Sequence, residues 1–277
     1  MKQSVRIGTA KRTLEIVEEG QYEHNSTIIN VKSEIKSTIE KTYTITPDSW
    51  EKIIGESVKI NATLSFETNI QILNGSTIKA IENAPKGLKT AVLNFASAKN
   101  PGGGFLGGAS AQEESLARSS SLYASQTKDW QMYNYNRGES TFLYSDYMIY
   151  SPETLFWFDD GGNTFAQPLV VDVITSPAPN KGAMLQHDRQ SEMAQIEKVF
   201  KSRIEKVLAL AVVNKVETII LGAWGCGVFR NEPADVANYF KEIIENQFRH
   251  SFKEIIFAIY DSSEKKANFK IFEEILR

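Results

Sequence analysis

The amino-acid sequence predicts an α/β fold in which a largely parallel sheet lies between two layers of helices. The strand candidates are short continuous runs rich in valine and isoleucine, which is typical of strands buried on both faces of a sheet. Segments with helical periodicity alternate with these runs, as they do in three-layer α/β proteins. With 277 residues, of which 42% are hydrophobic and 23% charged, the chain can bury a large core and differs from a disordered protein.

Strand and helix candidates follow one another from about residue 60 to residue 276. Apolar runs predict five strands, at residues 61–66, 90–96, 168–175, 217–221 and 254–260. A helix-like stretch covers residues 76–83, and a second helix is expected to open near residue 110. Apolar side chains that recur on one helical stripe predict three more helices, at residues 196–211, 236–248 and 269–276. Helices placed between buried strands should cover both faces of the sheet.

The first 60 residues differ from the rest of the chain. A Lys/Arg/Glu-rich amphipathic helix is predicted from residue 2 to residue 19, and threonine, isoleucine and lysine alternate from residue 28 to residue 45. No Pro/Gly/Ser-rich linker separates this part from residues 61–277. We therefore expect a single domain, residues 1–277, in which an N-terminal extension of helix and strand, residues 1–60, packs on a core of residues 61–277.

Aromatic side chains are concentrated in residues 130–158, which hold ten of the 29 in the chain. One interpretation is a wall of rings that stacks on a ligand. The other is a long irregular insertion that a small aromatic cluster of its own holds in place, because an irregular segment needs buried area to stay ordered. We favour the second interpretation. Residues 159–163, Asp-Asp-Gly-Gly-Asn, lack the ligand spacing of a calcium loop and predict a hairpin turn.

Charge and residue usage exclude several classes of protein. The formal net charge of −3 provides no global positive field for holding nucleic acid, and direct sequence-specific binding of nucleic acid is not expected. One cysteine and three scattered histidines offer neither a disulfide nor a zinc cluster, and we expect no metal and no cofactor. The first 20 residues lack the apolar core of a signal peptide, and no run is apolar enough to span a membrane. These features predict a soluble cytoplasmic protein.

The most informative segment follows the strand candidate at residues 90–96. The strand leads into Asn100-Pro101-Gly102-Gly103-Gly104, and Gln112-Glu113-Glu114 then stands at the start of a predicted helix. Three successive glycines allow positive φ and let backbone N–H groups approach an anion, at the edge of the sheet where α/β proteins bind ligands. Consecutive helical residues diverge by about 100°, so the two carboxyls should not form the facing pair of ordinary glycosidases. One acid would transfer the proton, and the other would hold a hydroxyl.

A second glycine-rich loop, Gly225-Cys226-Gly227-Val228-Phe229, lies between the strand candidate at residues 217–221 and a helix. Glycines at 225 and 227 would let N–H groups hold a diphosphate at a helix start without a lysine, and a tight strand-to-helix turn is the alternative. We expect positive φ at Gly227, where a side chain would intrude on the phosphate. Cys226 has no histidine near it in sequence, so it is expected to pack in the turn rather than act as a nucleophile.

The spacing of the first loop resembles a known family. Three glycines, seven residues and Gln-Glu-Glu are similar to the signature of the poly(ADP-ribose) glycohydrolases, whose pattern is Gly-Gly-Gly, six to eight residues and Gln-Glu-Glu. The segments NFASAKNPGGG, VITSPAPN and LGAWGCGVFRN resemble the shorter bacterial-type members, and the resemblance runs from residue 2 to the C-terminus. It implies a macrodomain fold with a mixed, mostly parallel sheet between helices. It also implies hydrolysis of the ribose–ribose O-glycosidic bonds of poly(ADP-ribose), with ADP-ribose as product.

The resemblance also implies roles for residues at matching positions. Glu114 resembles the catalytic acid that protonates the leaving ribose oxygen, Glu113 would orient the reacting ribose, and Gln112 would support the loop. Asn100 would contact a ribose hydroxyl, although the larger animal enzymes have an asparagine where this chain has Ser97. Phe229 resembles the aromatic residue beside the distal ribose.

Two other functions remain open at this stage. A macrodomain that binds ADP-ribose without cutting it is one, but two acids beside the phosphates would not help such a protein. A hydrolase that removes ADP-ribose from a protein or a nucleic-acid base is the other. The sequence leaves open the biological target, the choice between endo- and exo-cleavage, and the oligomeric state.

Overall fold

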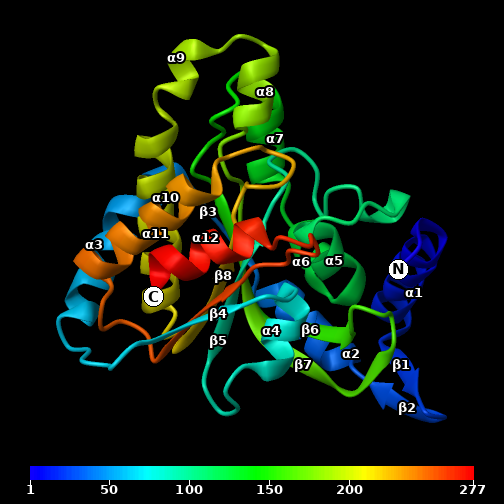
Figure 1. Cartoon of the computed structure of the whole chain (residues 1–277). Coiled ribbons are helices and arrows are strands. Elements are labelled where there is room, and N and C mark those ends of the chain that lie inside the picture. Colours follow the sequence, from blue (N-terminus) through cyan, green and yellow to red (C-terminus); the bar gives the residue numbers. More distant parts are fainter.

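The computed structural model describes residues 1–277 and is built on a seven-stranded mixed sheet (Figure 1). The strand order is β3-β6-β7-β5-β8-β9-β4, in which β7, β5, β8, β9 and β4 are parallel and β6 and β3 are antiparallel to their neighbours. The bounds are Tyr43–Ile45 for β3, Asn69–Leu73 for β4, Thr90–Phe95 for β5, Met148–Phe158 for β6, Thr164–Ser176 for β7, Thr218–Gly222 for β8 and Glu254–Ala258 for β9. The predicted mixed, mostly parallel sheet is confirmed.

Helices cover both faces of this sheet. Their bounds are Gln3–Glu19 for α1, Lys32–Lys41 for α2, Trp50–Asn61 for α3, Thr77–Asn83 for α4, Gln112–Ser119 for α5, Leu122–Gln126 for α6, Gln131–Gly138 for α7, Lys181–Gln186 for α8, Gln190–Met193 for α9, Ile196–Val213 for α10, Pro233–Gln247 for α11 and Ala267–Leu276 for α12. Two short 3₁₀ helices, η1 (Pro47–Ser49) and η2 (Phe105–Gly107), complete the set. No helix is both long and apolar enough to cross a lipid bilayer.

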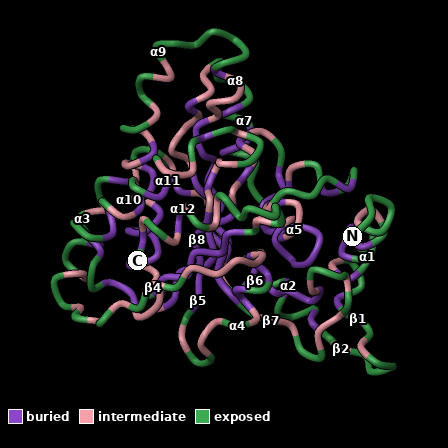
Figure 2. The backbone as a smooth tube through the Cα atoms, in the orientation of Figure 1, coloured by how far each residue is buried: buried purple, intermediate pink, exposed green.

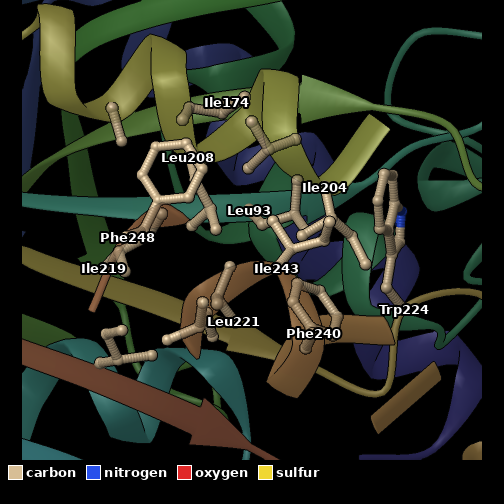
Figure 3. Close-up of a cluster of buried hydrophobic side chains, with 14 of the residues drawn as sticks. Leu93, Ile174, Ile204, Leu208, Ile219, Leu221, Trp224, Phe240, Ile243 and Phe248 are labelled. Carbon is tan, nitrogen blue, oxygen red and sulfur yellow. The ribbon is translucent and has the colours of Figure 1, made fainter. Parts of the chain in front are cut away.

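Each face of the sheet has its own hydrophobic core. The larger core joins the sheet to α3, α10, α11 and α12, and Figure 3 shows Leu93, Ile174 and Leu221 of the sheet against Leu208 of α10 and Phe240 of α11. The smaller core joins the other face to α4, α5 and α6. In Figure 2 the buried tube is concentrated in the central strands, whereas the loop between α8 and α9 and the tip of the β1–β2 hairpin are exposed.

The N-terminal 60 residues differ from the prediction at residues 32–41, which form a helix inside the stretch where threonine, isoleucine and lysine alternate. The predicted first helix is present as α1, but residues 28–45 form most of β2, then α2 and β3, and β1 (Gln21–His24) pairs with β2 (Thr27–Asn30) as a hairpin. Threonine and isoleucine suggest strands, yet Ile35 and Ile39 are one helical turn apart, so they face the same apolar cluster. Strand β3 then joins the main sheet, and α3 places Trp50 in the larger core.

Two further sequence predictions are wrong. No strand forms at residues 61–66, because α3 ends at Asn61 and the edge position beside β9 is taken by β4, whose Ile70 and Ile72 pack on the core. The aromatic segment 130–158 is also not an irregular insertion, since its last 11 residues are the long strand β6. The β6–β7 hairpin turn is confirmed: the Asp159 side chain accepts hydrogen bonds from the N–H groups of Gly161 and Asn163, both at 2.8 Å.

Candidate active site

A cavity of about 770 Å³ extends along the carboxyl ends of the parallel strands. Its walls include residues that lie at the ends of β4, β5, β7, β8 and β9 or within two residues after them: Gly75, Phe95, Ala178, Ala223 and Tyr260 are examples. Because parallel strands present their carboxyl ends at one edge of the sheet, loops far apart in the sequence meet there. The position of the cavity is therefore a consequence of the sheet topology.

The first glycine-rich loop brings the backbone against both acidic side chains. Gly102 and Gly103 have φ of 65° and 57°, a conformation that other residues rarely adopt. A Cβ on Gly103 would overlap the Glu114 carboxyl and lie 3.2 Å from Oε2 of Glu113. Gly104 donates its N–H to Oε1 of Glu114 at 3.0 Å. Only a glycine at position 103 permits this close approach.

The two adjacent carboxyls occupy different environments. Glu113 is 3% exposed, and it accepts hydrogen bonds from the Ser97 N–H (2.7 Å) and from the side-chain amides of Asn94 (3.3 Å) and Gln126 (3.1 Å). Burial raises the pKa of Glu113 to about 8, and the nearby Glu114 charge adds to the rise, although the three donors oppose it. Glu114 is only partly buried and meets the glycine loop.

Gln112 fastens the start of α5 to the sheet. Beyond Val92, β5 no longer pairs with β8, so backbone groups of β5 are left without a strand partner on that side. The Gln112 side chain satisfies two of them, because its Nε2 donates to the Leu93 carbonyl at 2.9 Å and its Oε1 accepts from the Phe95 N–H at 2.9 Å. The N-terminal turn of α5, with both acids, is thereby held in register with the strand.

Asn100 lies at the surface of the glycine loop. Its side chain is exposed, and Oδ1 accepts a long hydrogen bond of 3.4 Å from Arg137 of α7. The asparagine that contacts an acid is Asn94, which was not among the predicted site residues. A polar residue inside the otherwise apolar strand β5 was the available signal. Gln126, on the short helix α6, was also missed, and nothing in its local sequence marks it.

The second loop, residues 225–229, presents free backbone donors to the cavity. The N–H groups of Gly225, Gly227, Val228 and Phe229 donate to no protein acceptor, whereas the Cys226 N–H is used by the Ala223 carbonyl. All five residues line the cavity. Such a group of unpaired amides is suited to an anion.

One expectation for this loop is wrong. Positive φ occurs at Gly225 (73°), not at Gly227, where a Cβ would meet nothing within 4 Å. The crowded glycine is Gly225, whose Cβ would lie 2.7 Å from Ala178. Burial raises the pKa of Cys226 to about 12, with nearby acids adding to the rise, so its thiol stays protonated and fits a packing role.

Phe229 is partly buried and packs against Tyr144, with ring centroids 6.0 Å apart. Tyr144 belongs to the aromatic segment, so this segment does bring one ring to the second loop. Gln112 and residues 225–229 line the cavity, whereas the glycines at 102–104, Glu113, Glu114 and Asn100 lie beside it. No group of three or more His, Cys, Asp or Glu side chains is placed to hold a metal ion.

Comparisons with known proteins agree on one family. A family model described as the catalytic domain of microbial-type PARG matches residues 10–159. The structure is similar to poly(ADP-ribose) glycohydrolase from Thermomonospora curvata bound to the inhibitor ADP-HPD, with a TM-score of 0.89 and 35% identity over 98% of this chain and 99% of that chain. It is also similar to the Deinococcus radiodurans enzyme in complex with ADP-ribose, with a TM-score of 0.82 and 36% identity over 87% of this chain and 96% of that chain. No curated protein sequence matches.

Proposed function

The chain belongs to the microbial-type poly(ADP-ribose) glycohydrolases, and we propose from this premise that it hydrolyses the ribose–ribose O-glycosidic bonds of poly(ADP-ribose) and releases ADP-ribose. The observation that carries the proposal is the pair of neighbouring carboxyls on α5 that meet at Gly103, one buried and one partly exposed. A protein that only binds ADP-ribose gains nothing from two acids close to an anionic ligand. An enzyme that moves a proton at a glycosidic oxygen needs at least one of them.

Glu114 is the general acid in this proposal. Its carboxyl donates a proton to the bridging oxygen as the glycosidic bond breaks, and the bonding electron pair leaves with that oxygen. The carboxylate then takes a proton from the water that attacks the oxocarbenium-like carbon, which restores the acid. The Gly104 N–H, 3.0 Å from Oε1, orients Glu114 for both steps.

Glu113 orients the reacting ribose through a hydroxyl. Three donors from β5, the following loop and α6 hold its carboxyl in one place. With a pKa of about 8, Glu113 is mostly neutral at pH 7, so it adds little negative charge beside a substrate that already has two phosphates. Gln112 supports this arrangement by its bonds to β5.

The diphosphate of the bound unit lies on the free N–H groups of residues 225–229 in this proposal. Phe229 packs beside the distal ribose, and Asn100 and the glycines at 102–104 form the wall near the reacting ribose. Proton transfer and charge stabilisation both come from protein groups, so the mechanism itself requires no metal.

Substrate comparison tests the proposed function. The purified protein is incubated with poly(ADP-ribose), with mono-ADP-ribosylated protein and with ADP-ribosylated DNA, and released ADP-ribose is measured by chromatography. Release from the polymer at the highest kcat/KM supports the proposal. Faster release from either mono-modified substrate would assign the enzyme to another linkage, and binding without release from any substrate would make it a binding module.

Two variants test the assignment of the acids. Glu114→Gln should stop hydrolysis and keep ADP-ribose binding, and Glu113→Gln should also lower turnover by misplacing the ribose. If Glu113→Gln proved the more severe of the two, the roles would be exchanged. We also propose a cytoplasmic location, because a single cysteine offers no disulfide to an oxidising compartment, and cell fractionation tests this.

A further inference from the structure

One end of the large cavity is positively charged although the chain has a net charge of −3. The charged residues in the cavity wall are Arg6 of α1, Lys79 of α4, Arg118 of α5 and one acid, Asp160 of the β6–β7 turn. The first 14 residues also contain four lysines and arginines and no acid. The charge is therefore local, and it lies where α1 and α5 border the cavity.

Arg118 is a buried cation without an acidic partner. Its side chain is 5% exposed, and its guanidinium donates to the Ala109 carbonyl at 3.2 Å and to the Ser115 hydroxyl at 2.6 Å. The Nε group has no acceptor at all. A buried charge normally has an ion-pair partner, because removing it from water is costly. Arg118 meets only neutral acceptors.

Arg6 also donates its hydrogen bonds to neutral carbonyl groups and not to an acid. Its Nε donates to the Gly108 carbonyl and its Nη1 to the Met1 carbonyl, both at 2.6 Å. The arginines that form ion pairs are others: Arg189, Arg203 and Arg277. Burial lowers the pKa of Arg118 and the Arg6 charge lowers it further, while the charges of Glu114 and Asp160 raise it. The two guanidinium groups therefore repel each other, and both line the cavity.

We propose that Arg6 and Arg118 form a second anion subsite, which binds a phosphate of the ADP-ribose unit that adjoins the unit being released. This inference rests on the proposed function. A single bound ADP-ribose has one diphosphate, and residues 225–229 already offer it four free N–H groups. The next unit of the polymer brings another diphosphate to the same cavity. Two unpaired guanidinium groups supply the charge that this second diphosphate needs.

Binding measurements in the inactive Glu114→Gln background test the subsite without cleavage. Calorimetry compares the affinity for a short poly(ADP-ribose) oligomer with the affinity for ADP-ribose, with and without Arg6→Gln. We expect oligomer affinity to fall about tenfold, the effect of one lost charged hydrogen bond, while ADP-ribose affinity changes less than twofold. Arg6→Lys should restore part of the loss, because it keeps the charge. Arg12→Gln is the matched control, since Arg12 lies exposed on the same helix and does not line the cavity.

Salt dependence provides a second readout that needs no variant. Each additional phosphate contact should steepen the fall of log affinity with log salt by about 0.7, so the oligomer should show a steeper slope than ADP-ribose. Equal slopes would overturn the proposal, as would an equal loss of both affinities in Arg6→Gln or an equal loss of oligomer affinity in Arg12→Gln. Failure of the proposed function would appear separately, as a wild-type protein that binds the oligomer and does not cleave it.

Discussion

Replacing Glu113 by glutamine should stabilise the protein at alkaline pH while it damages the enzyme. The pKa of this carboxyl rises from 4.5 to about 8 in the folded protein because it is buried. Between these values the folded chain retains a proton that the unfolded chain has released. The stability of the wild type must therefore fall as pH increases from 4.5 to 8. Glutamine cannot ionise, so the variant avoids this cost.

The magnitude follows from the size of the rise. At about 1.4 kcal/mol for each pH unit, a change from 4.5 to about 8 corresponds to about 5 kcal/mol above pH 8. The glutamine oxygen can keep the bond from the Ser97 N–H, and the amide nitrogen then takes the position of Oε1 and faces the side-chain amides of Asn94 and Gln126. Rotation of these two amides turns their unpartnered oxygens toward the new N–H groups, so we expect a remaining loss of only about 1 kcal/mol. We expect a net gain of about 4 kcal/mol at pH 8.5.

Urea unfolding at several pH values between 4.5 and 8.5 measures this difference. At pH 4.5 the variant should be no more stable than the wild type, and its advantage should grow steadily up to pH 8.5. Glu114→Gln is the matched control, because it removes a neighbouring, partly exposed carboxyl and should change stability by less than about 1 kcal/mol throughout. A difference between Glu113→Gln and wild type that stays constant across this range would refute the reasoning.

Four further predictions concern the site and the N-terminal segment. Glu114→Gln should lower kcat by at least about 10² to 10⁴-fold with ADP-ribose binding retained, and more than a tenth of wild-type turnover would exclude Glu114 as the acid. Activity should persist in excess EDTA, and a loss that a divalent cation restores would point to a metal-dependent mechanism. Gly227→Ala should bind ADP-ribose normally and Gly227→Glu should lose binding at an unchanged melting temperature, because position 227 has room for a side chain but faces the expected phosphate. Normal binding by Gly227→Glu would show that the diphosphate lies elsewhere. A chain that starts at residue 61 should fail to fold, because it lacks β3 and Trp50, and a cooperative unfolding transition in that fragment would contradict this.

Buried parallel strands were the part of the fold that the sequence predicted best. Strands β5, β8 and β9 carry continuous apolar runs because both of their faces are covered by helices. The edge strand β4 lacks that signal, since its exposed positions are polar, and it was placed eight residues too early. Strand β6 was not predicted, for another reason. Its aromatic residues suggested an isolated cluster, and only its pairing with β7 and β3 shows that they belong to the main sheet.

The sequence predicted the parts of the site that are contiguous along the chain, and it did not predict contacts between segments that are far apart in sequence. The acids and both glycine-rich loops are contiguous in sequence, so their spacing identifies them. Asn94 and Gln126 meet Glu113 only because β5, α5 and α6 pack together, and no local pattern records that contact. Within residues 225–229 the conformation with positive φ occurs at Gly225, where a Cβ would also collide with Asn231 and Ala178. Neither of these two residues belongs to the loop, so the loop sequence alone does not show which glycine is crowded.

Helix geometry explains why the adjacent residues Glu113 and Glu114 differ in burial. Successive side chains on α5 point about 100° apart, so Glu113 and Glu114 cannot face the same surroundings. Gln112 fixes the start of the helix against β5, and this directs Glu113 into the space between β5 and α6. Glu114 is then directed toward the glycine loop, where Gly103 leaves room for its carboxyl. One turn of α5, held to β5 by the hydrogen bonds of Gln112, therefore provides both a buried acid with a raised pKa and a partly exposed acid. The two acids do not have to come from separate segments of the chain.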